Sequence, residues 1–447
     1  MSDTIAAVAT ASGVGSVAIV RVSGDNALDI AKKVTKRETF SPRYAHLSSL
    51  YNQNDELIDE AIVIWFKAPH SFTTEDVVEF QCHGGSIVAE KILETVLFYG
   101  ARLAEPGEFT RRAFLGGRID LTEAEAIAKL IEAKSDETAK ILARQMKGEL
   151  REFVDDVREK LLRAVAFAEV TIDYAEEDLP DDIVNNILHQ LEEIELKIGQ
   201  IVSSSERRRG MIEGFKVSIV GKPNVGKSSL LNAMLGYKRA IVSDIAGTTR
   251  DTIEEQIRVG SHLIRIIDTA GIRDSSDTIE KIGIERSVEA IEQSDIVIAI
   301  FDVSRTWDEE DEQILSLLEK SGNNKEIIVA LNKIDLPKKL DTKKLEQFNP
   351  LQLSQDNKAE QIFSELEKRL SKMAQGDELL LISARQIEAV KRARSAISQA
   401  KEPLLMGELE IFTFHLNDAI SAISSISKPV DFNDIMDKMF GEFCLGK

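Results

Sequence analysis

The chain has 447 residues, of which 43% are hydrophobic and 30% are charged, and its formal net charge at pH 7 is -20. This length predicts two or three domains, and the negative charge argues against a protein whose whole surface binds nucleic acid. The two cysteines, Cys82 and Cys444, exclude a disulfide framework and predict a reducing, cytoplasmic location. We expect no signal peptide and no membrane span, because polar residues and glycines interrupt the apolar stretch 5–22 and no apolar run approaches about 18 residues.

The first 118 residues combine short apolar runs with segments of helical spacing. The runs 16–22, 60–66 and 76–81 predict strands. The segments 27–34 and 87–99 predict helices. Interleaved strands and helices of this kind indicate an α+β domain over residues 1–118.

Helical spacing predominates over residues 119–213. Thr122 and Glu125 have the spacing of a capping box and predict the start of a helix. From Ile187 to Ile201 apolar residues recur every three or four positions, which favours packing inside a helical bundle over a coiled coil. We interpret Arg207-Arg208-Arg209 as a solvated helix end in preference to an RNA-binding patch. Residues 119–213 are therefore predicted to form the first part of a helical domain.

The next segment carries the pattern of a phosphate-binding loop, an apolar run followed by G-x-x-x-x-G-K-S from Gly221 to Ser228. Gly221 and Gly226 allow the tight turn that directs backbone N–H groups at a polyphosphate. Lys227 would place its charge near the β and γ phosphates, and Ser228 would offer a hydroxyl to Mg²⁺. The helix from Ser229 would direct its positive end at the phosphates.

Three further motifs follow in the order expected of a GTP-binding domain. Gly247-Thr248-Thr249-Arg250-Asp251 supplies a threonine hydroxyl that can complete the Mg²⁺ shell. In Asp268-Thr269-Ala270-Gly271 the carboxylate can hold a Mg²⁺-bound water, and the glycine N–H can contact a γ-phosphate. In Asn332-Lys333-Ile334-Asp335 the Asp335 carboxylate can accept hydrogen bonds from both N1–H and the amino group of guanine. Adenine lacks this donor pair, so the predicted nucleotide is GTP.

Strands and helices alternate over residues 214–375. Apolar runs at 217–220, 263–267, 296–302 and 327–331 predict strands with helices between them. This order indicates a doubly wound, mainly parallel sheet, and ligands of such sheets bind at the carboxyl ends of the strands. Three of the four motifs follow directly on such runs.

The last guanine-contacting loop has two candidates. Ile382-Ser383-Ala384-Arg385 has the better sequence, but it follows the amphipathic segment 359–373, which should be the final helix of the sheet domain. Leu353-Ser354-Gln355 precedes that segment, so we assign the contact to Ser354 and interpret Ser383 as the start of another helix. Helical spacing then returns from Gln386 to Phe443, and we assign residues 376–447 to the second part of the helical domain. We therefore expect the sheet domain to be an insertion in a single helical domain.

The residue after the Asp268 motif is Ile272, which cannot orient an attacking water as a glutamine would. Asn224, inside the phosphate loop, could bind a monovalent cation against the β/γ bridge, where an arginine finger would otherwise act, and the carbonyls of the segment 243–248 could close over the same ion. On spacing alone, Asn224 could equally stabilise the turn through its own backbone. Glu280 is the acidic candidate for orienting water, although the pattern by itself favours a surface glutamate.

The predicted site falls into catalytic and binding groups. The catalytic group is Lys227, Gly271 and Glu280. The nucleotide-binding group is Asn224, Val225, Gly226, Lys227, Ser228, Ser229, Ser243, Asp244, Ile245, Ala246, Gly247, Thr248, Thr249, Asp268, Thr269, Ala270, Gly271, Asn332, Lys333, Asp335 and Ser354.

With these motifs in view, the chain resembles the tRNA-modification GTPase family called MnmE or TrmE over essentially its whole length. The resemblance is carried by the four motifs, by the inserted topology and by the C-terminal Cys444-Leu445-Gly446-Lys447. It implies an N-terminal domain similar to folate-binding aminomethyltransferase domains, which would dimerise and hold a tetrahydrofolate derivative. It further implies folate contacts at Arg21, Glu79, Arg118 and Lys447.

The resemblance also implies a reaction and a partner. Together with an FAD- and NADH-using partner of the MnmG type, the protein would install an aminomethyl or carboxymethylaminomethyl group on C5 of wobble uridine 34 of certain tRNAs. The tRNA would be held mainly through the partner. GTP hydrolysis, accelerated by K⁺ and by G domains meeting across a homodimer, would drive the cycle.

Particular residues receive roles from the same resemblance. The K⁺ ligands would be Asn224, Ser243, Ile245 and Thr248, the Mg²⁺ ligands Ser228 and Thr249, and the catalytic glutamate Glu280. Cys444 is a candidate reactive thiol, although a small buried residue near the chain end is the simpler interpretation.

Two other functions compete with this one. A ribosome-assembly GTPase would share only the G domain and bind rRNA, but the acidic chain shows no basic accessory domain. A purely structural, nucleotide-gated dimer would hydrolyse GTP at a rate indifferent to exchange of K⁺ for Na⁺.

Overall fold

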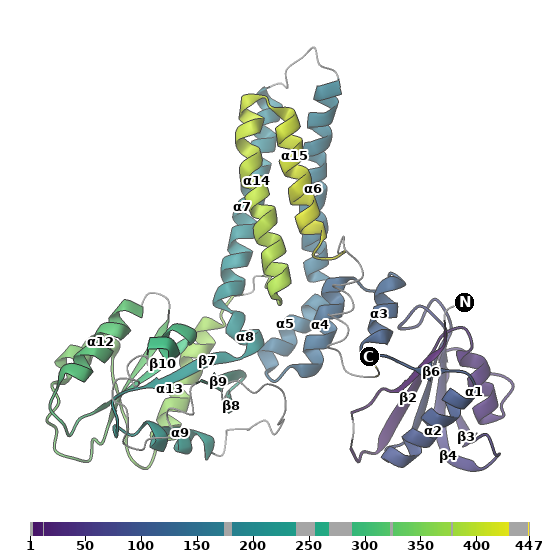
Figure 1. Ribbon diagram of the computed structural model, residues 1–447, viewed down its shortest axis with the longest axis horizontal. Helices are drawn as coiled ribbons and strands as arrows, with labels where there is room; N and C mark the ends of the chain where they lie inside the picture. Colours follow the sequence, from purple (N-terminus) through teal and green to yellow (C-terminus); the bar gives the residue numbers. More distant parts are fainter. Residues whose placement is uncertain are drawn as a thin grey trace. The chain divides into compact units, whose positions relative to one another are not determined.

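The computed structural model describes residues 3–11, 13–173, 181–237, 255–267, 288–321, 325–376, 379–428 and 446 (Figure 1). Within these ranges the chain forms two sheets and a set of long helices, which confirms a multidomain protein with both α and β structure. No helix in the described part of the chain is both long and apolar enough to cross a membrane.

The N-terminal segment forms an α+β unit around a six-stranded sheet of order β3-β4-β5-β2-β1-β6. Only β1 and β6 pair in parallel, and the other neighbours are antiparallel. The sequence did not predict β1, β3, β6 or α3. The elements are β1 (Ile5–Val8), β2 (Val17–Ser23), α1 (Ala27–Thr35), β3 (His46–Tyr51), β4 (Leu57–Phe66), β5 (Val77–His83), α2 (Ser86–Phe98), β6 (Arg102–Leu103) and α3 (Glu108–Leu115).

The two faces of this sheet differ. The helices α1 and α2 pack Ile30, Val34 and Ile92 against one face in a closed hydrophobic core. On the opposite face Leu47 of β3 lies beside Ile62 of β4, and these side chains are 63% and 40% exposed. The sheet therefore buries one face within the chain and leaves part of the other face open.

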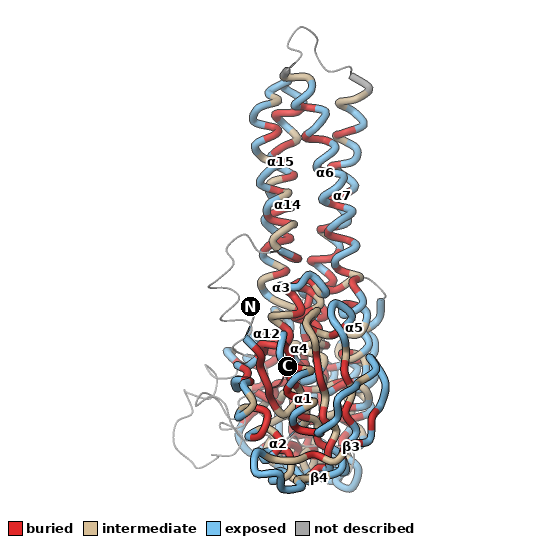
Figure 2. Tube along the Cα trace, turned by 90° about the vertical axis from the view of Figure 1, so that its right-hand side faces the viewer, coloured by how far each residue is buried: buried red, intermediate tan, exposed pale blue. Residues whose placement is uncertain are grey.

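The helical segments are α4 (Leu121–Glu132), α5 (Asp136–Met146), α6 (Glu149–Asp173), α7 (Asp181–Arg207), α8 (Arg209–Glu213), α14 (Ala384–Met406) and α15 (Leu409–Ser424). Helix α6 packs on α15, although the sheet domain lies between them in sequence. This packing supports the predicted insertion. Figure 2 shows buried residues recurring along both helices between exposed ones, as expected of a bundle.

Two local predictions in this region were wrong. The helix α4 begins one residue before Thr122, and its capping box is formed by Asp120 and Glu123, whose carboxylates accept hydrogen bonds from each other's backbone N–H. In the arginine run, Arg208 is buried and donates to the carbonyl of Gly376, so the run is not a uniformly solvated helix end.

The sheet domain is doubly wound as predicted, with strand order β12-β11-β10-β7-β9-β8. Only β8 and β9 pair antiparallel. The elements are β7 (Phe215–Val220), α9 (Lys227–Leu235), β8 (Glu255–Val259), β9 (His262–Ile266), β10 (Ile296–Asp302), α12 (Glu309–Ser321), β11 (Glu326–Asn332), η1 (Thr342–Phe348), β12 (Leu351–Gln352) and α13 (Lys358–Met373). Strand β10 is buried along its whole length, as a central parallel strand should be.

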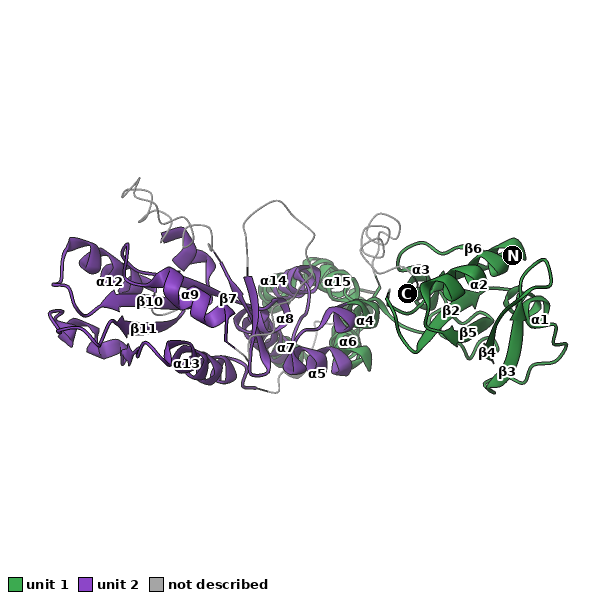
Figure 3. Ribbon diagram, turned by 90° about the horizontal axis from the view of Figure 1, so that it is seen from below, with its two compact units in different colours: residues 1–128, 145–191, 395–447 green, residues 129–144, 192–394 purple. Residues whose placement is uncertain are grey.

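By compactness the chain divides into two units, residues 1–128, 145–191 and 395–447 in one and residues 129–144 and 192–394 in the other (Figure 3). These divisions fall inside helices α4, α5, α7 and α14. The domain boundaries expected from the sequence fall between elements instead, after α3, after α8 and after α13. They remain a prediction.

Candidate functional site

The phosphate loop leaves β7 at Gly221 and enters α9 at Lys227, with three residues in the left-handed region. Gly221 has φ 151°, Asn224 has φ 64° and Gly226 has φ 109°. A Cβ on Gly221 would lie 2.6 Å from the carbonyl oxygen of Ile300, and a Cβ on Gly226 would lie 2.2 Å from Nδ2 of Asn332. Both positions therefore need glycine, for conformation and for space.

Lys227 folds back over the start of the loop. Its Nζ donates to the carbonyl oxygens of Gly221 at 2.7 Å and Lys222 at 2.9 Å. Burial lowers the pKa of Lys227, because removing an ammonium from water disfavours its charged form. An anionic ligand at this position would restore the charged form, which is the chemistry expected of a phosphate-binding lysine.

The guanine motif lies against the phosphate loop. Nδ2 of Asn332 donates to the carbonyl of Val225 at 2.7 Å. Nζ of Lys333 donates to the carbonyl of Asn224 at 3.1 Å and to Oδ2 of the buried Asp302 at 2.6 Å. The carboxyl ends of β7 and β11 thus bring together two motifs more than a hundred positions apart in sequence.

The loop after β12 lies next to the guanine motif. Strand β12 pairs in parallel with β11, and Nε2 of Gln355 donates to Oδ2 of the exposed Asp335 at 3.4 Å. The N–H of the adjacent Ser354 donates to Oε1 of Gln361 at 3.1 Å. Ser383, by contrast, directly precedes helix α14, as predicted. The guanine contact assigned to Ser354 stays a prediction that this geometry favours.

Other members of the predicted nucleotide site are partly described. Ser228 and Ser229 lie in the first turn of α9, and the Ser229 hydroxyl accepts from Nζ of Lys358. The residues that lie outside the described ranges are Ser243, Asp244, Ile245, Ala246, Gly247, Thr248, Thr249, Asp268, Thr269, Ala270, Gly271 and Glu280.

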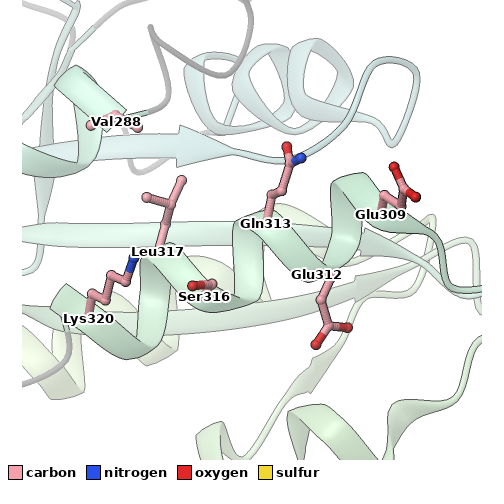
Figure 4. A pocket seen from close by; sticks show the side chains of 7 residues that line it. All are labelled: Val288, Glu309, Glu312, Gln313, Ser316, Leu317 and Lys320. Carbon is pink, nitrogen blue, oxygen red and sulfur yellow. The ribbon is translucent and has the colours of Figure 1, made fainter.

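A shallow hollow of about 500 Å³ opens elsewhere on the sheet domain, beside α12 (Figure 4). All of its lining side chains except Val288 come from that helix, and they are Glu309, Glu312, Gln313, Ser316, Leu317 and Lys320. None of them belongs to the predicted nucleotide site. Recognition of phosphate or guanine is therefore not assigned to this hollow.

A second group of predicted residues meets on the N-terminal sheet. Arg21 of β2 lies directly opposite Glu79 of β5, and its Nε donates to Oε1 at 2.9 Å. Arg118 donates through Nη1 to the carbonyl of Ser71. The guanidinium groups of Arg21 and Arg118 lie 5.8 and 5.9 Å from the centre of the Phe72 ring. Two predicted folate contacts, Arg21 and Arg118, therefore lie at one aromatic ring, and the third, Glu79, pairs with Arg21.

One residue of the C-terminal tetrapeptide, Gly446, lies against the same sheet. Gly446 is buried, and a Cβ on it would lie 2.3 Å from the carbonyl oxygen of Val8 in β1. Strand β1 pairs with β2, where Ala7 lies opposite Arg21. Lys447 and Cys444 lie outside the described residues.

Sequence reasoning missed several residues of both sites. Phe72 and the fully buried Phe109, whose ring centre lies 5.6 Å from the Arg21 guanidinium, had no motif to mark them. Asp302 could have been found, because it ends a predicted strand at the edge of the sheet where the nucleotide motifs lie. Lys222 lies inside the phosphate loop, but the pattern G-x-x-x-x-G-K-S accepts any residue type at its position and so does not mark it.

Both the N-terminal sheet and the rest of the chain are similar to known proteins. Residues 4–118 match the family described as the GTP-binding protein TrmE N-terminus, and residues 121–444 match the MnmE helical domain. The tRNA modification GTPase MnmE of Sulfurovum sp. is 63% identical over 447 residues, covering 100% of this chain and 99% of that protein.

The chain belongs to the MnmE family. The MnmE of Sulfurimonas denitrificans is 58% identical over 445 residues and that of Aliarcobacter butzleri 55% over 446, each covering 100% of this chain and 99% of the relative. Membership of the MnmE family and the assembled motifs make the chain a GTP-binding enzyme that hydrolyses GTP. A crystal structure of Era with MgGDPNP and 16S ribosomal RNA covers 41% of this chain and 66% of its own at 25% identity and a TM-score of 0.26, and the MnmE assignment does not depend on it.

Proposed function

We propose that this GTPase works with an FAD- and NADH-dependent partner of the MnmG type to place an aminomethyl or carboxymethylaminomethyl group on C5 of wobble uridine 34 of certain tRNAs. The observation that carries the proposal is the likeness to tRNA modification GTPases along the full chain. A ribosome-assembly GTPase would share only the sheet domain with this chain. It would leave residues 4–118 without a role, together with the charged site that Arg21, Glu79 and Arg118 form on the N-terminal sheet.

The charged site of the N-terminal sheet fits a tetrahydrofolate derivative, which would supply the one-carbon unit. The Glu79 carboxylate can accept from pteridine N–H donors, and the guanidinium groups of Arg21 and Arg118 can pair with the carboxylates of the glutamate tail. The half-exposed Phe72 ring offers an apolar surface between the two arginines. Lys447 would add a further cation.

The described residues of the phosphate loop include one proposed ligand for each metal ion, Ser228 for Mg²⁺ and Asn224 for K⁺. Ser228 opens α9 beside Lys227, where its hydroxyl would join Thr249 in holding Mg²⁺. Asn224 would join Ser243, Ile245 and Thr248 in holding K⁺, and the contact from Lys333 holds the backbone of Asn224 in its left-handed conformation. GTP hydrolysis measured in K⁺ and in Na⁺ tests this role, and equal rates would contradict it.

The open face of the N-terminal sheet supports a homodimer. Leu47 and Ile62 form an exposed apolar pair across β3 and β4, a pattern typical of a face that another protein surface covers. Light scattering should show a dimer for the natural chain and a monomer for the variant Leu47→Asp with Ile62→Asp. Leu103→Asp, an exposed position at the β6 edge, is the matched control. We also place the protein in the cytoplasm, where its tRNA substrates would be.

The decisive experiment is mass spectrometry of tRNA from cells that lack this protein. We expect wobble uridine without the C5 group, and expression of the natural chain should restore the modification. Modified uridine in the deleted strain would contradict the proposal. A variant that still hydrolyses GTP but carries Arg21→Ala should fail to restore the group, which separates the one-carbon site from the GTPase.

A further inference from the structure

The second residue of the phosphate loop, Lys222, directs its side chain at a pair of carboxylates. Its Nζ lies 2.6 Å from Oδ2 of Asp308 and 2.7 Å from Oδ2 of Asp311. The side chain of Lys222 is only 6% exposed and that of Asp311 only 3%. A lysine buried to this extent is rare unless it is paired, so the contact is a built feature of the fold.

The two carboxylates form the capping box of helix α12. Oδ1 of Asp308 accepts from the N–H groups of Glu310 and Asp311, and Oδ2 of Asp311 accepts from the N–H of Asp308. This arrangement brings two negative charges close together. The hydrogen bond from Lys222 lowers the pKa of Asp308, which keeps that carboxylate ionised. Lys222 is therefore the counter-ion of the start of α12.

The sheet topology explains why a loop residue reaches this helix. Strands β7 and β10 are parallel neighbours, so Gly221 and the segment that leads from β10 into α12 leave the sheet at the same edge. The backbone carbonyl of Lys222 meanwhile accepts a hydrogen bond from Nζ of Lys227. Lys222 thus contacts both the start of α12, through its side chain, and Lys227, through its backbone carbonyl. Lys227 is the lysine expected to bind phosphate.

We propose that Lys222 is a positioning residue for GTP binding: Asp308 and Asp311 hold its side chain, and this fixes the two peptide carbonyls that receive Lys227. The proposal rests on the GTPase activity and not on the proposed tRNA chemistry. A loop held in its binding conformation before the nucleotide arrives loses less conformational freedom on binding. Lys222 therefore acts on affinity, and the rate of hydrolysis at saturation depends on other groups.

The test is the dissociation constant of GDP and of GTP for the full-length protein, with kcat at saturating GTP. Lys222→Met keeps the length of the side chain but leaves two carboxylates uncompensated, and we expect nucleotide binding weaker by about tenfold. We expect kcat to change by less than about threefold, because the reacting groups stay in place. Lys222→Arg keeps the charge and should restore most of the affinity.

The control removes a more exposed ion pair that also involves helix α12. Nζ of Lys344 in η1 lies 2.6 Å from Oε2 of Glu312, and the two side chains are 44% and 56% exposed. Neither residue belongs to the phosphate loop, so Lys344→Met should leave nucleotide affinity unchanged. A folded Lys222→Met protein that binds GDP as tightly as the natural chain, with only a lower melting temperature, would reduce Lys222 to a structural residue and overturn the proposal.

A second variant covers the case in which Lys222→Met does not fold. Asp308 is 54% exposed, so Asp308→Asn should fold while weakening one of the two anchors. We expect about threefold weaker GDP binding, as for loss of a partly exposed charged hydrogen bond. Unchanged GDP affinity in folded Asp308→Asn would also overturn the proposal.

Discussion

The nucleotide site and the charged site of the N-terminal sheet, formed by Arg21, Glu79 and Arg118, differ in how much they depend on backbone shape. Around the phosphate loop several side chains bind the backbone carbonyls of the loop, as Asn332 on Val225 and Lys227 on Gly221 show. Around Arg21 the key contacts join side chains, as in its pairs with Glu79 and Phe72. We expect substitution of a glycine in the phosphate loop to cause a large loss of nucleotide affinity, because the site depends on backbone shape. Removal of one side chain from the site around Arg21 should cause a smaller loss of ligand affinity.

The sharpest test of this difference is Gly226→Ala. The added Cβ would lie 2.2 Å from Nδ2 of Asn332 in a residue at φ 109°, so it would strain the backbone and displace the Asn332 contact together. We expect GTP binding to weaken by about a hundredfold. The control Gly236→Ala, at a right-handed position at the end of α9, should bind GTP normally in the same fluorescence titration.

Asp335→Asn tests the guanine end of the site. The amide would present a donor to N1–H of guanine where the carboxylate accepts, and we expect the KM for GTP to rise by about thirtyfold. Gln355→Ala removes only the 3.4 Å contact to the same carboxylate and should change KM by less than about threefold. Comparable losses in both variants would mean that Asp335 acts through its neighbour and not through the base.

Arg21→Ala tests the side-chain site. It leaves the Glu79 carboxylate without its guanidinium partner, and we expect calorimetry to show tetrahydrofolate binding weaker by about tenfold. Lys32→Ala removes the surface ion pair with Asp29 on α1 and should leave folate binding intact. A folded Arg21→Ala protein with undiminished affinity would place the folate elsewhere.

The smallest effect concerns acid stability of the N-terminal sheet domain. Burial alone would raise the pKa of Glu108, but hydrogen bonds from Arg102, Arg112 and the backbone of Glu105 hold it below its ordinary value of 4.5. Such a carboxylate contributes stability above its unfolded pKa, and this contribution is lost as the pH falls through its folded pKa. We expect denaturant unfolding to show about 1 kcal/mol of stability lost below about pH 4, and less in Glu108→Gln. An unchanged acid profile in that variant would assign the loss to other groups.

The sequence by itself determined the nucleotide, the doubly wound sheet and the family. The phosphate loop from Gly221 to Ser228 could be predicted from sequence, because its backbone conformation requires glycine at two positions whatever surrounds them. Periodicity likewise indicated helices α6, α7 and α15, because one face of each must be buried. The short strands β1 and β6 were missed, since four and two residues are too few to show a period.

Only the tertiary structure decided which distant side chains meet. The pairing of Arg21 with Glu79 follows from the register of β2 against β5, and the burial of Lys222 follows from the neighbouring ends of β7 and β10. Register and strand order arise from packing over the whole sheet, so no local pattern in the chain records them. The capping box of α4 is a local feature, but Thr122 and Glu125 have the same spacing in sequence as Asp120 and Glu123, and only the helix start at Leu121 in the folded chain selects Asp120 and Glu123.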